Sequence, residues 1–321
     1  MEDRICRRMM ILRAGPMLTV QDRGRTGYMK YGIGESGVMD HKSYAEANRL
    51  VGNKDNEAVL EATLMGPKIQ FESDCLIAVT GADMDASIES APIERGKAIK
   101  VYAGQTLMMG FAKKGCRAYI AVSGGIDVPV VMGSRSTNIK CHIGGYEGRA
   151  LKDGDKLPLG KENFAAGEEG KLLAQHEVPE DYPEEIQVRV IMGPQDSRFT
   201  GNGIVSFLTE TYTVSPQSDR MGIRLDGQKI ESENGTDIIS DGIVFGSIQI
   251  TSDGNPIVLM ADHQTTGGYA KIATVVYEDL HLLAQARPGC KVKFIRTDIK
   301  SFDSSRGLWN RLAHLFRGKG A

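Results

Sequence analysis

The sequence has 321 residues, of which 41% are hydrophobic, and its 39 basic and 41 acidic residues give a formal net charge of −2. A chain of this length and composition can bury one large core or two ordinary ones, and it lies outside the disordered class. The near-neutral charge balance gives no electrostatic case for nucleic acid, so we expect a small molecule or another protein as the partner.

The chain carries no clear targeting or redox signal. Its longest apolar runs are far shorter than a membrane span, and its N-terminal stretch lacks the long apolar region of a signal peptide. We therefore expect a cytoplasmic protein that does not bind a membrane. The five cysteines are scattered and form no C-x-x-C pair, which predicts reduced thiols and no metal site.

Most of the chain has the pattern of short strands separated by glycine-rich turns. In chain order, we predict strands at residues 17–22, 66–71, 75–82, 84–89, 98–104, 105–112, 116–124, 186–193, 247–254, 256–262 and 290–298. Helical patterns are few and occupy residues 40–52, where Asp40 is the N-cap, 197–210 and 275–286. The sequence thus predicts a mainly β protein, built of β-barrels with a few helices.

The composition changes near the middle of the chain. Residues 161–186 are charged and show no strand alternation, so we interpret them as a linker. This divides the chain into a first β-barrel lobe at 1–160 and a second at 187–300. A faint internal repeat supports two related halves. Residues 301–321 place apolar side chains at helical spacing, which predicts a C-terminal amphipathic helix.

Four clusters of polar residues lie in predicted loops, at 19–41, 123–138, 213–227 and 261–271. The cluster at 123–138 combines a glycine-rich backbone with Ser, Arg and Thr side chains, which suit an anion. In the cluster at 261–271, an Asp beside a His suits proton transfer near neutral pH. Each cluster has a plain structural alternative, in which its side chains satisfy one another and the loop backbone.

Six segments of the chain occur in the same order in a known family: GPMLTVQDRGRTGY, GESGVMDHKSYAEANRLVGN, AVSGGIDVPVVMGSRST, GPQDSRF, SPQSDRMGIRLDG and ADHQTTGGYAKIATV. On these segments the sequence resembles the family of the 5-oxoprolinase C component. That family is also described as the Kip-type kinase regulator KipA, as allophanate hydrolase subunit 2, and as a biotin-dependent carboxyltransferase-like domain.

The resemblance implies a fold of two linked cyclophilin-like β-barrel lobes. It also implies partners, since members act beside a B component and, together with an A component, convert 5-oxoproline to glutamate at the expense of ATP. Fused relatives carry the carboxyltransferase half of urea carboxylase, in which carboxybiotin is the donor.

The resemblance also implies that the loops at 217–220 and 262–269 face one ligand. From their side-chain chemistry, we predict catalytic roles for Asp219, Arg220, Asp262 and His263. The predicted substrate-binding residues are Gln217, Ser218, Gln264, Thr265, Thr266, Gly267, Gly268, Tyr269, Arg135 and Ser136.

Three functions remain open at this point. The leading hypothesis is the C component of an ATP-dependent 5-oxoprolinase, a hydrolase component that is inactive alone and binds ATP only within the complex. The second is a carboxyltransferase component that needs biotin on a separate carrier, since the sequence has no A-M-K-M segment of its own. The third is a Kip-type regulatory protein that binds a B-like, KipI-type kinase inhibitor.

Overall fold

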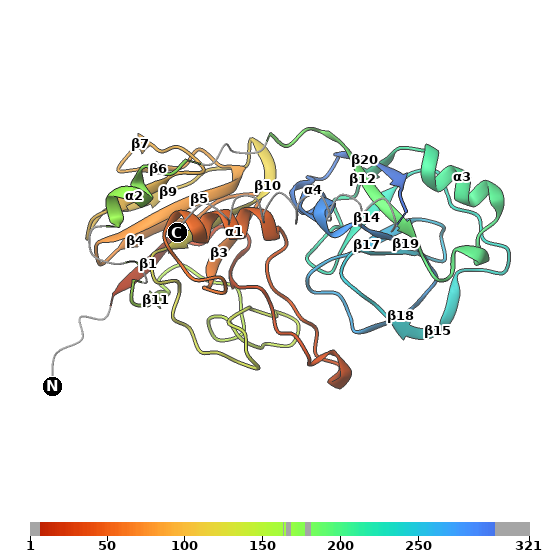
Figure 1. Ribbon diagram of the computed structural model, residues 1–321, viewed down its shortest axis with the longest axis horizontal. Helices are drawn as coiled ribbons and strands as arrows, with labels where there is room; N and C mark the ends of the chain where they lie inside the picture. The colour runs from red at the N-terminus through yellow and green to blue at the C-terminus, as the bar shows by residue number, and fades with distance from the viewer. Residues whose placement is uncertain (1–6, 163, 165–167, 177–180, 299–321) are drawn as a thin grey trace, which may run out of the picture.

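The computed structural model describes residues 7–162, 164, 168–176 and 181–298. Its strands form two lobes that lie side by side (Figure 1). Strands β1 to β11 build the first lobe, and β12 to β20 build the second. The mainly β prediction is confirmed. The predicted helix at 301–321 lies outside the described residues.

The first lobe contains two antiparallel sheets. One has six strands in the order β11 (Lys156–Pro158), β1 (Arg8–Arg13), β4 (Lys68–Phe71), β9 (Thr106–Met108), β6 (Ser87–Ile88) and β7 (Ala91–Pro92). The other has five strands in the order β2 (Leu18–Gln21), β3 (Val59–Thr63), β10 (Lys114–Val122), β5 (Cys75–Asp83) and β8 (Ala98–Val101). Hydrogen bonding in this lobe therefore gives two sheets, where the sequence predicted a single barrel.

The alternation of side chains along β5 and β10 explains how the five-stranded sheet packs between the other sheet and α1. Ile77 and Ile120 pack into the core that the two sheets share. Their neighbours Leu76 and Tyr119 point to the opposite face and pack against α1 (His41–Leu50). Successive residues of a strand face opposite sides of its sheet, so the five-stranded sheet is buried on both faces.

The second lobe contains a closed barrel of seven strands. Their order is β12 (Glu185–Met192), β19 (Lys271–Val275), β16 (Ser247–Ile250), β17 (Pro256–Leu259), β14 (Gly222–Asp226), β13 (Tyr212–Val214) and β20 (Lys291–Arg296). The parallel pairing of β12 with β20 completes the barrel. A separate two-stranded sheet joins β15 (Asp237–Gly242) to β18 (Thr266–Tyr269).

Helices cover opposite sides of the barrel. Helix α4 (Leu280–Gln285) lies at the boundary with the first lobe, whereas α3 (Gly201–Thr209) lies on the far side (Figure 1). Three single-turn 3₁₀ helices are η1 (Met29–Tyr31), η2 (Asp196–Arg198) and η3 (Tyr277–Asp279). No helix within the described ranges is long and apolar enough to cross a membrane.

The predicted linker at 161–186 contains a short helix. Helix α2 (Glu169–Leu173) lies within it, and Leu172 is buried in the core that covers α1. The apolar Leu172 explains why this segment packs on the first lobe. The first strand of the second lobe is β12, which begins at Glu185.

Candidate functional site

The turn before β14 carries Arg220 into the junction between the lobes. The guanidinium forms ion pairs with Glu61 of β3 and with Asp262, where Nε lies 2.8 Å from Oδ2. Nη2 also donates to the carbonyl oxygen of Gly37 at 2.6 Å. Burial alone lowers the pKa of Arg220, but the carboxylates of Asp262 and Glu61 outweigh it and raise the pKa above its usual value. Arg220 is therefore a buried cation that joins the lobes.

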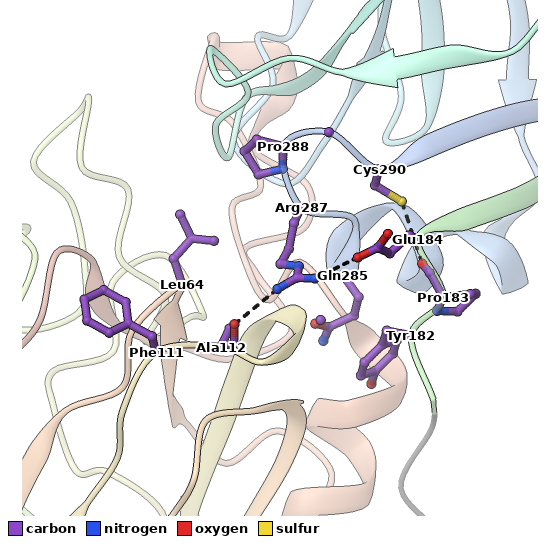
Figure 2. Close-up of a pocket in the computed structure, with 12 residues that line it drawn as sticks. Leu64, Phe111, Ala112, Tyr182, Pro183, Glu184, Gln285, Arg287, Pro288 and Cys290 are labelled. Atoms are coloured by element: carbon purple, nitrogen blue, oxygen red, sulfur yellow. Dashed lines mark hydrogen bonds and ion pairs between the residues drawn. The ribbon is translucent and has the colours of Figure 1, made fainter.

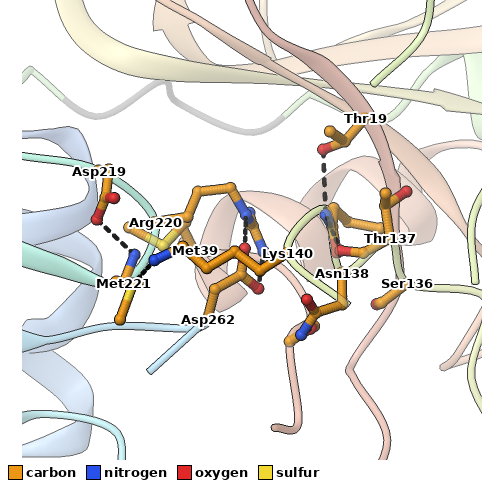
Figure 3. A network of polar contacts seen from close by, with 12 residues as sticks. Thr19, Met39, Ser136, Thr137, Asn138, Lys140, Asp219, Arg220, Met221 and Asp262 are labelled. Atoms are coloured by element: carbon orange, nitrogen blue, oxygen red, sulfur yellow. Dashed lines mark hydrogen bonds and ion pairs between the residues drawn. The ribbon is translucent and has the colours of Figure 1, made fainter. Parts of the chain in front are cut away.

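The other carboxylate oxygen of Glu61 accepts hydrogen bonds from the first lobe. This atom, Oε2, accepts the backbone N–H of Met39 at 2.9 Å and the hydroxyl of Tyr119 at 2.8 Å. Burial, reinforced by the charge of Glu61, raises the pKa of Tyr119 and keeps the hydroxyl a donor. Arg220 and Asp262 point toward each other beside Met39 (Figure 3). The structure thus gives Arg220 a contact between the lobes, and Asp262 pairs with it from within the second lobe.

His263 is buried next to this junction. Its Nδ1 lies 2.6 Å from the carbonyl oxygen of Gln264, so the ring is held by its own loop. Neither His263 nor the Arg220–Asp262 pair lines the pocket that gathers the other predicted residues. Three of the four residues predicted to be catalytic are therefore packed into the junction.

A pocket of about 280 Å³, here called the barrel pocket, lies among β14, β16, β17 and β18. Five of the predicted site residues line it: Asp219, Gln264, Gly267, Gly268 and Tyr269. Ile243, Ile257 and Leu259 supply an apolar wall. The loops before β14 and after β17 therefore contribute residues to the same pocket.

Local backbone contacts position the polar groups of the barrel pocket. One carboxylate oxygen of Asp219 accepts the N–H groups of Met221 and Gly222 at 2.8 and 3.2 Å. Across the pocket, a Cβ on Gly267 would lie 2.5 Å from Nε2 of Gln249 and from Cδ1 of Ile243, so a larger residue there must displace these two side chains. Asp219 keeps its second oxygen available to a ligand.

Three polar residues of the barrel pocket were not predicted as site residues: Lys140, Arg224 and Gln249. Lys140 comes from the first lobe and reaches across the boundary, where its Nζ contacts Sδ of Met221 (Figure 3). No local sequence pattern predicts a binding role for Lys140, because its partner Met221 is distant in the sequence. Arg224 lies in β14, at the end of the polar cluster 213–227, and Gln249 is a buried amide whose place inside the apolar strand β16 could have marked it.

The other residues of the two loops have separate environments. Gln217 lines an adjoining cavity of about 380 Å³, which shares Arg224 and Tyr269 with the barrel pocket. The hydroxyl of Ser218 accepts the backbone N–H of Arg224 at 3.0 Å and so shapes the turn. Thr265 offers its carbonyl oxygen to the N–H of Ile243 at 3.2 Å. Thr266 is an exposed residue of β18.

The predicted anion cradle of the first lobe is filled by the chain itself. The hydroxyls of Ser134 and Ser136 both donate to Oδ1 of Asp22 at 2.6 Å, and the N–H of Arg135 donates to Oδ2 at 2.6 Å. The guanidinium of Arg135 donates to the carbonyl oxygen of Val128 at 3.0 Å. Arg135 and Ser136 therefore bind an internal carboxylate and lie apart from the barrel pocket.

Two larger cavities lie at the lobe boundary. One, of about 540 Å³, has Leu64, Phe111 and Pro288 on its walls (Figure 2). Its cation Arg287 already donates to carbonyl oxygens of the first lobe, including that of Ala112 at 3.2 Å. The other, of about 780 Å³, is lined by His41, whose pKa is lowered by burial. Across the described residues, no group of three or more His, Cys, Asp or Glu side chains is placed to hold a metal ion.

Known proteins resemble this chain in both sequence and fold. The chain is 39% identical over 293 residues to the C component of 5-oxoprolinase from Escherichia coli, covering 90% of this chain and 91% of that protein. It is 34% identical to urea amidolyase of Saccharomyces cerevisiae, covering 92% of this chain and 17% of that protein. The crystal structure of the Kluyveromyces lactis urea carboxylase superposes with a TM-score of 0.82 at 32% identity, covering 91% of this chain and 27% of that one.

The family described as "Carboxyltransferase domain, subdomain A and B" matches residues 31–296. The match covers both lobes, the Arg220 junction and the barrel pocket. This chain belongs to the carboxyltransferase subdomain A and B family, in which it is a homologue of the 5-oxoprolinase C component.

Proposed function

We propose that this chain is the C component of an ATP-dependent 5-oxoprolinase and that it acts with A-like and B-like partners to convert 5-oxoproline into L-glutamate. One observation carries the proposal: the alignment spans 91% of the E. coli C component, whereas it spans only 17% of the yeast urea amidolyase. The similarity thus extends over a whole 5-oxoprolinase component and over one segment of the larger enzyme. The proposal places the complex in the cytoplasm, where ATP is available.

The reaction needs energy because opening this lactam in water is uphill. In balance, 5-oxoproline, ATP and two water molecules give glutamate, ADP and phosphate. Phosphorylation of the amide oxygen, followed by attack of one water molecule on the former carbonyl carbon, breaks the lactam C–N bond and leaves an acyl phosphate. The second water molecule hydrolyses this acyl phosphate to the carboxylate and phosphate. In this proposal the barrel pocket holds the lactam, with its ring against Ile257 and its N–H directed at the free oxygen of Asp219.

ATP is assigned to the assembled complex. The sequence holds no Walker-type phosphate loop. Residues 32–37 match G-x-G-x-x-G, but they follow η1 and not a strand. A Cβ on Gly37 would lie 2.9 Å from the backbone of Arg23, so that loop is closely packed. No residue of this chain is therefore proposed to bind ATP.

Carboxyl transfer is the second candidate function. It is favoured by the description of the family and by the 34% identity to the yeast urea amidolyase. In this reading the barrel pocket takes the acceptor, while carboxybiotin on a separate carrier protein supplies the carboxyl group.

Reconstitution with matched variants tests the proposal. The chain, its A-like and B-like partners, ATP and 5-oxoproline should yield glutamate and ADP together, and omission of the chain should abolish both. Gly267→Ala should lower kcat/KM about tenfold or more, because the new methyl pushes Gln249 and Ile243 into the pocket. Gly201→Ala in α3 is the control, since a Cβ there meets nothing within 4 Å and the residue lies outside the barrel pocket.

Two results would count against the proposal. The first is a mixture that makes no glutamate, and the second is glutamate production that does not depend on this chain. Carboxylation of urea by the chain with a carboxybiotin carrier would favour the second candidate instead.

A further inference from the structure

Two cations face the barrel pocket without an anionic partner. Within the described part of the chain, Lys140 and Arg224 form no ion pair, and the one side-chain contact of Lys140 is with Met221. Other cations near the site are paired: Lys271 lies 2.5 Å from a carboxylate oxygen of Asp241. Both free cations therefore remain available to a ligand.

The charge of the pocket selects for an anion. Lys140 and Arg224 are its two cationic residues, and Asp219 is its one carboxylate among the described residues. Backbone N–H groups already stabilise Asp219, which lessens its need for either cation. An excess of positive charge in a small concave site attracts anions. The pocket residues carry a net charge of about +1, which matches a ligand with a single negative charge.

The size and lining of the pocket narrow the class of anion. Its 280 Å³ lies just below the usual range for ligand sites, about 300–1,000 Å³, which favours a small ligand. The apolar wall of Ile257 and Leu259 faces amides such as Gln264, which suits a compact molecule with an apolar body. Arg and Lys side chains together recognise a carboxylate by a planar fork and a point charge.

We propose that the barrel pocket binds a small carboxylate, with the anionic group between Nζ of Lys140 and the guanidinium of Arg224. An N–H donor elsewhere on the ligand meets the free oxygen of Asp219. 5-Oxoproline has both features, so the identity of the ligand rests on the proposed function, whereas its chemical class rests on the two cations. Because Lys140 belongs to the first lobe, the site is complete only when the lobes are docked.

Calorimetric titration of the full chain, alone and in the reconstituted complex, tests this site. The probes are 5-oxoproline, 2-pyrrolidinone, which has the same ring without the carboxylate, and inorganic phosphate. We expect 2-pyrrolidinone to bind about tenfold or more weaker than 5-oxoproline, since a hydrogen bond to a charged group contributes about 1.5–3 kcal/mol. Binding of 5-oxoproline should weaken with added salt.

Matched variants locate the anion. Lys140→Ala and Arg224→Ala should each weaken 5-oxoproline binding about tenfold or more, and Lys140→Arg should retain most of it. Lys54→Ala removes the same charge from an exposed loop of the first lobe and should bind as the parent does. In the complex, Lys140→Ala should raise KM for 5-oxoproline. Melting curves should show that all four variants fold.

Several outcomes would overturn the carboxylate site. They are equal binding of the two lactams, tighter binding of phosphate than of 5-oxoproline, parent-like binding by Lys140→Ala and Arg224→Ala, and no binding to either chain or complex. The two proposals fail separately. If the complex makes no glutamate but the variants change binding as expected, the carboxylate site stands and the 5-oxoprolinase assignment falls.

Discussion

Replacing Arg220 with alanine should destabilise the whole chain and not only its activity. The guanidinium is paired with Glu61 and Asp262, whose side chains are only 1% and 11% exposed. The substitution leaves two carboxylates buried without their cation, and breaking such a pair costs about 3–5 kcal/mol. At about 2–4 °C per kcal/mol, the melting temperature should fall by on the order of 10 °C.

Differential scanning calorimetry of the purified chain measures this loss. Arg224→Ala is the control, because it removes an exposed arginine from the adjoining strand β14 and should change stability by less than about 0.5 kcal/mol. The structural role of Arg220 would be refuted if Arg220→Ala melted within about 2 °C of the parent while the reconstituted complex lost all activity. That pattern would return Arg220 to the catalytic role that the sequence predicted.

Two further predictions concern contacts elsewhere in the fold. Gln285→Ala should lower the free energy of unfolding by about 1–3 kcal/mol or more, because Oε1 of Gln285 accepts the N–H groups of Cys116 and Arg117, and removing it leaves two buried donors unpaired. The denaturant midpoint should therefore fall, and an unchanged midpoint would contradict this. The hydrogen bond from Lys271 lowers the pKa of Asp241 in the folded state below the value of about 3.9 that the group has in the unfolded chain. The contact therefore stabilises the fold fully above about pH 3.9, and this stabilisation is lost as the pH falls through the lower pKa of the folded state. Unfolding titrations from pH 6 down to pH 3 should show a shallower loss of stability in Asp241→Asn than in the parent, and parallel pH profiles would refute the linkage.

Local patterns in the sequence were sufficient for many of the strands and for the start of α1. Asp40 was expected to cap the first long helix, and its side chain accepts the N–H of Ser43 at 3.0 Å at the start of α1. The alternation around Ile77 and Ile120 predicted buried strands, and β5 and β10 are the central strands of their sheet.

Other strands lack a local signal. The strand β18 has the sequence TGGY, and glycine carries little β propensity, so only its pairing with β15 makes it a strand. The first lobe was expected to be a barrel like the second. Barrel closure depends on which strands pair over long distances, and strand patterns do not encode that choice.

The candidate site shows the same division between local and distant information. Sequence reasoning placed Arg220 and Asp262 together, and they are in contact. Their joint partner Glu61 is far away in the sequence, so the chemistry of the pair alone could not distinguish a buried ion pair from a catalytic pair. Lys140 was missed for the same reason, because only the docking of two lobes brings it to the barrel pocket.

Met39 ties the folding of the two lobes together. This side chain belongs to the loop before α1 but is completely buried in the apolar core of the second lobe. A fragment that begins at residue 187 would lose that side chain from its interior and would also leave Arg220 without Glu61. Such a fragment should aggregate, and the intact chain should unfold in one cooperative transition although its architecture has two lobes.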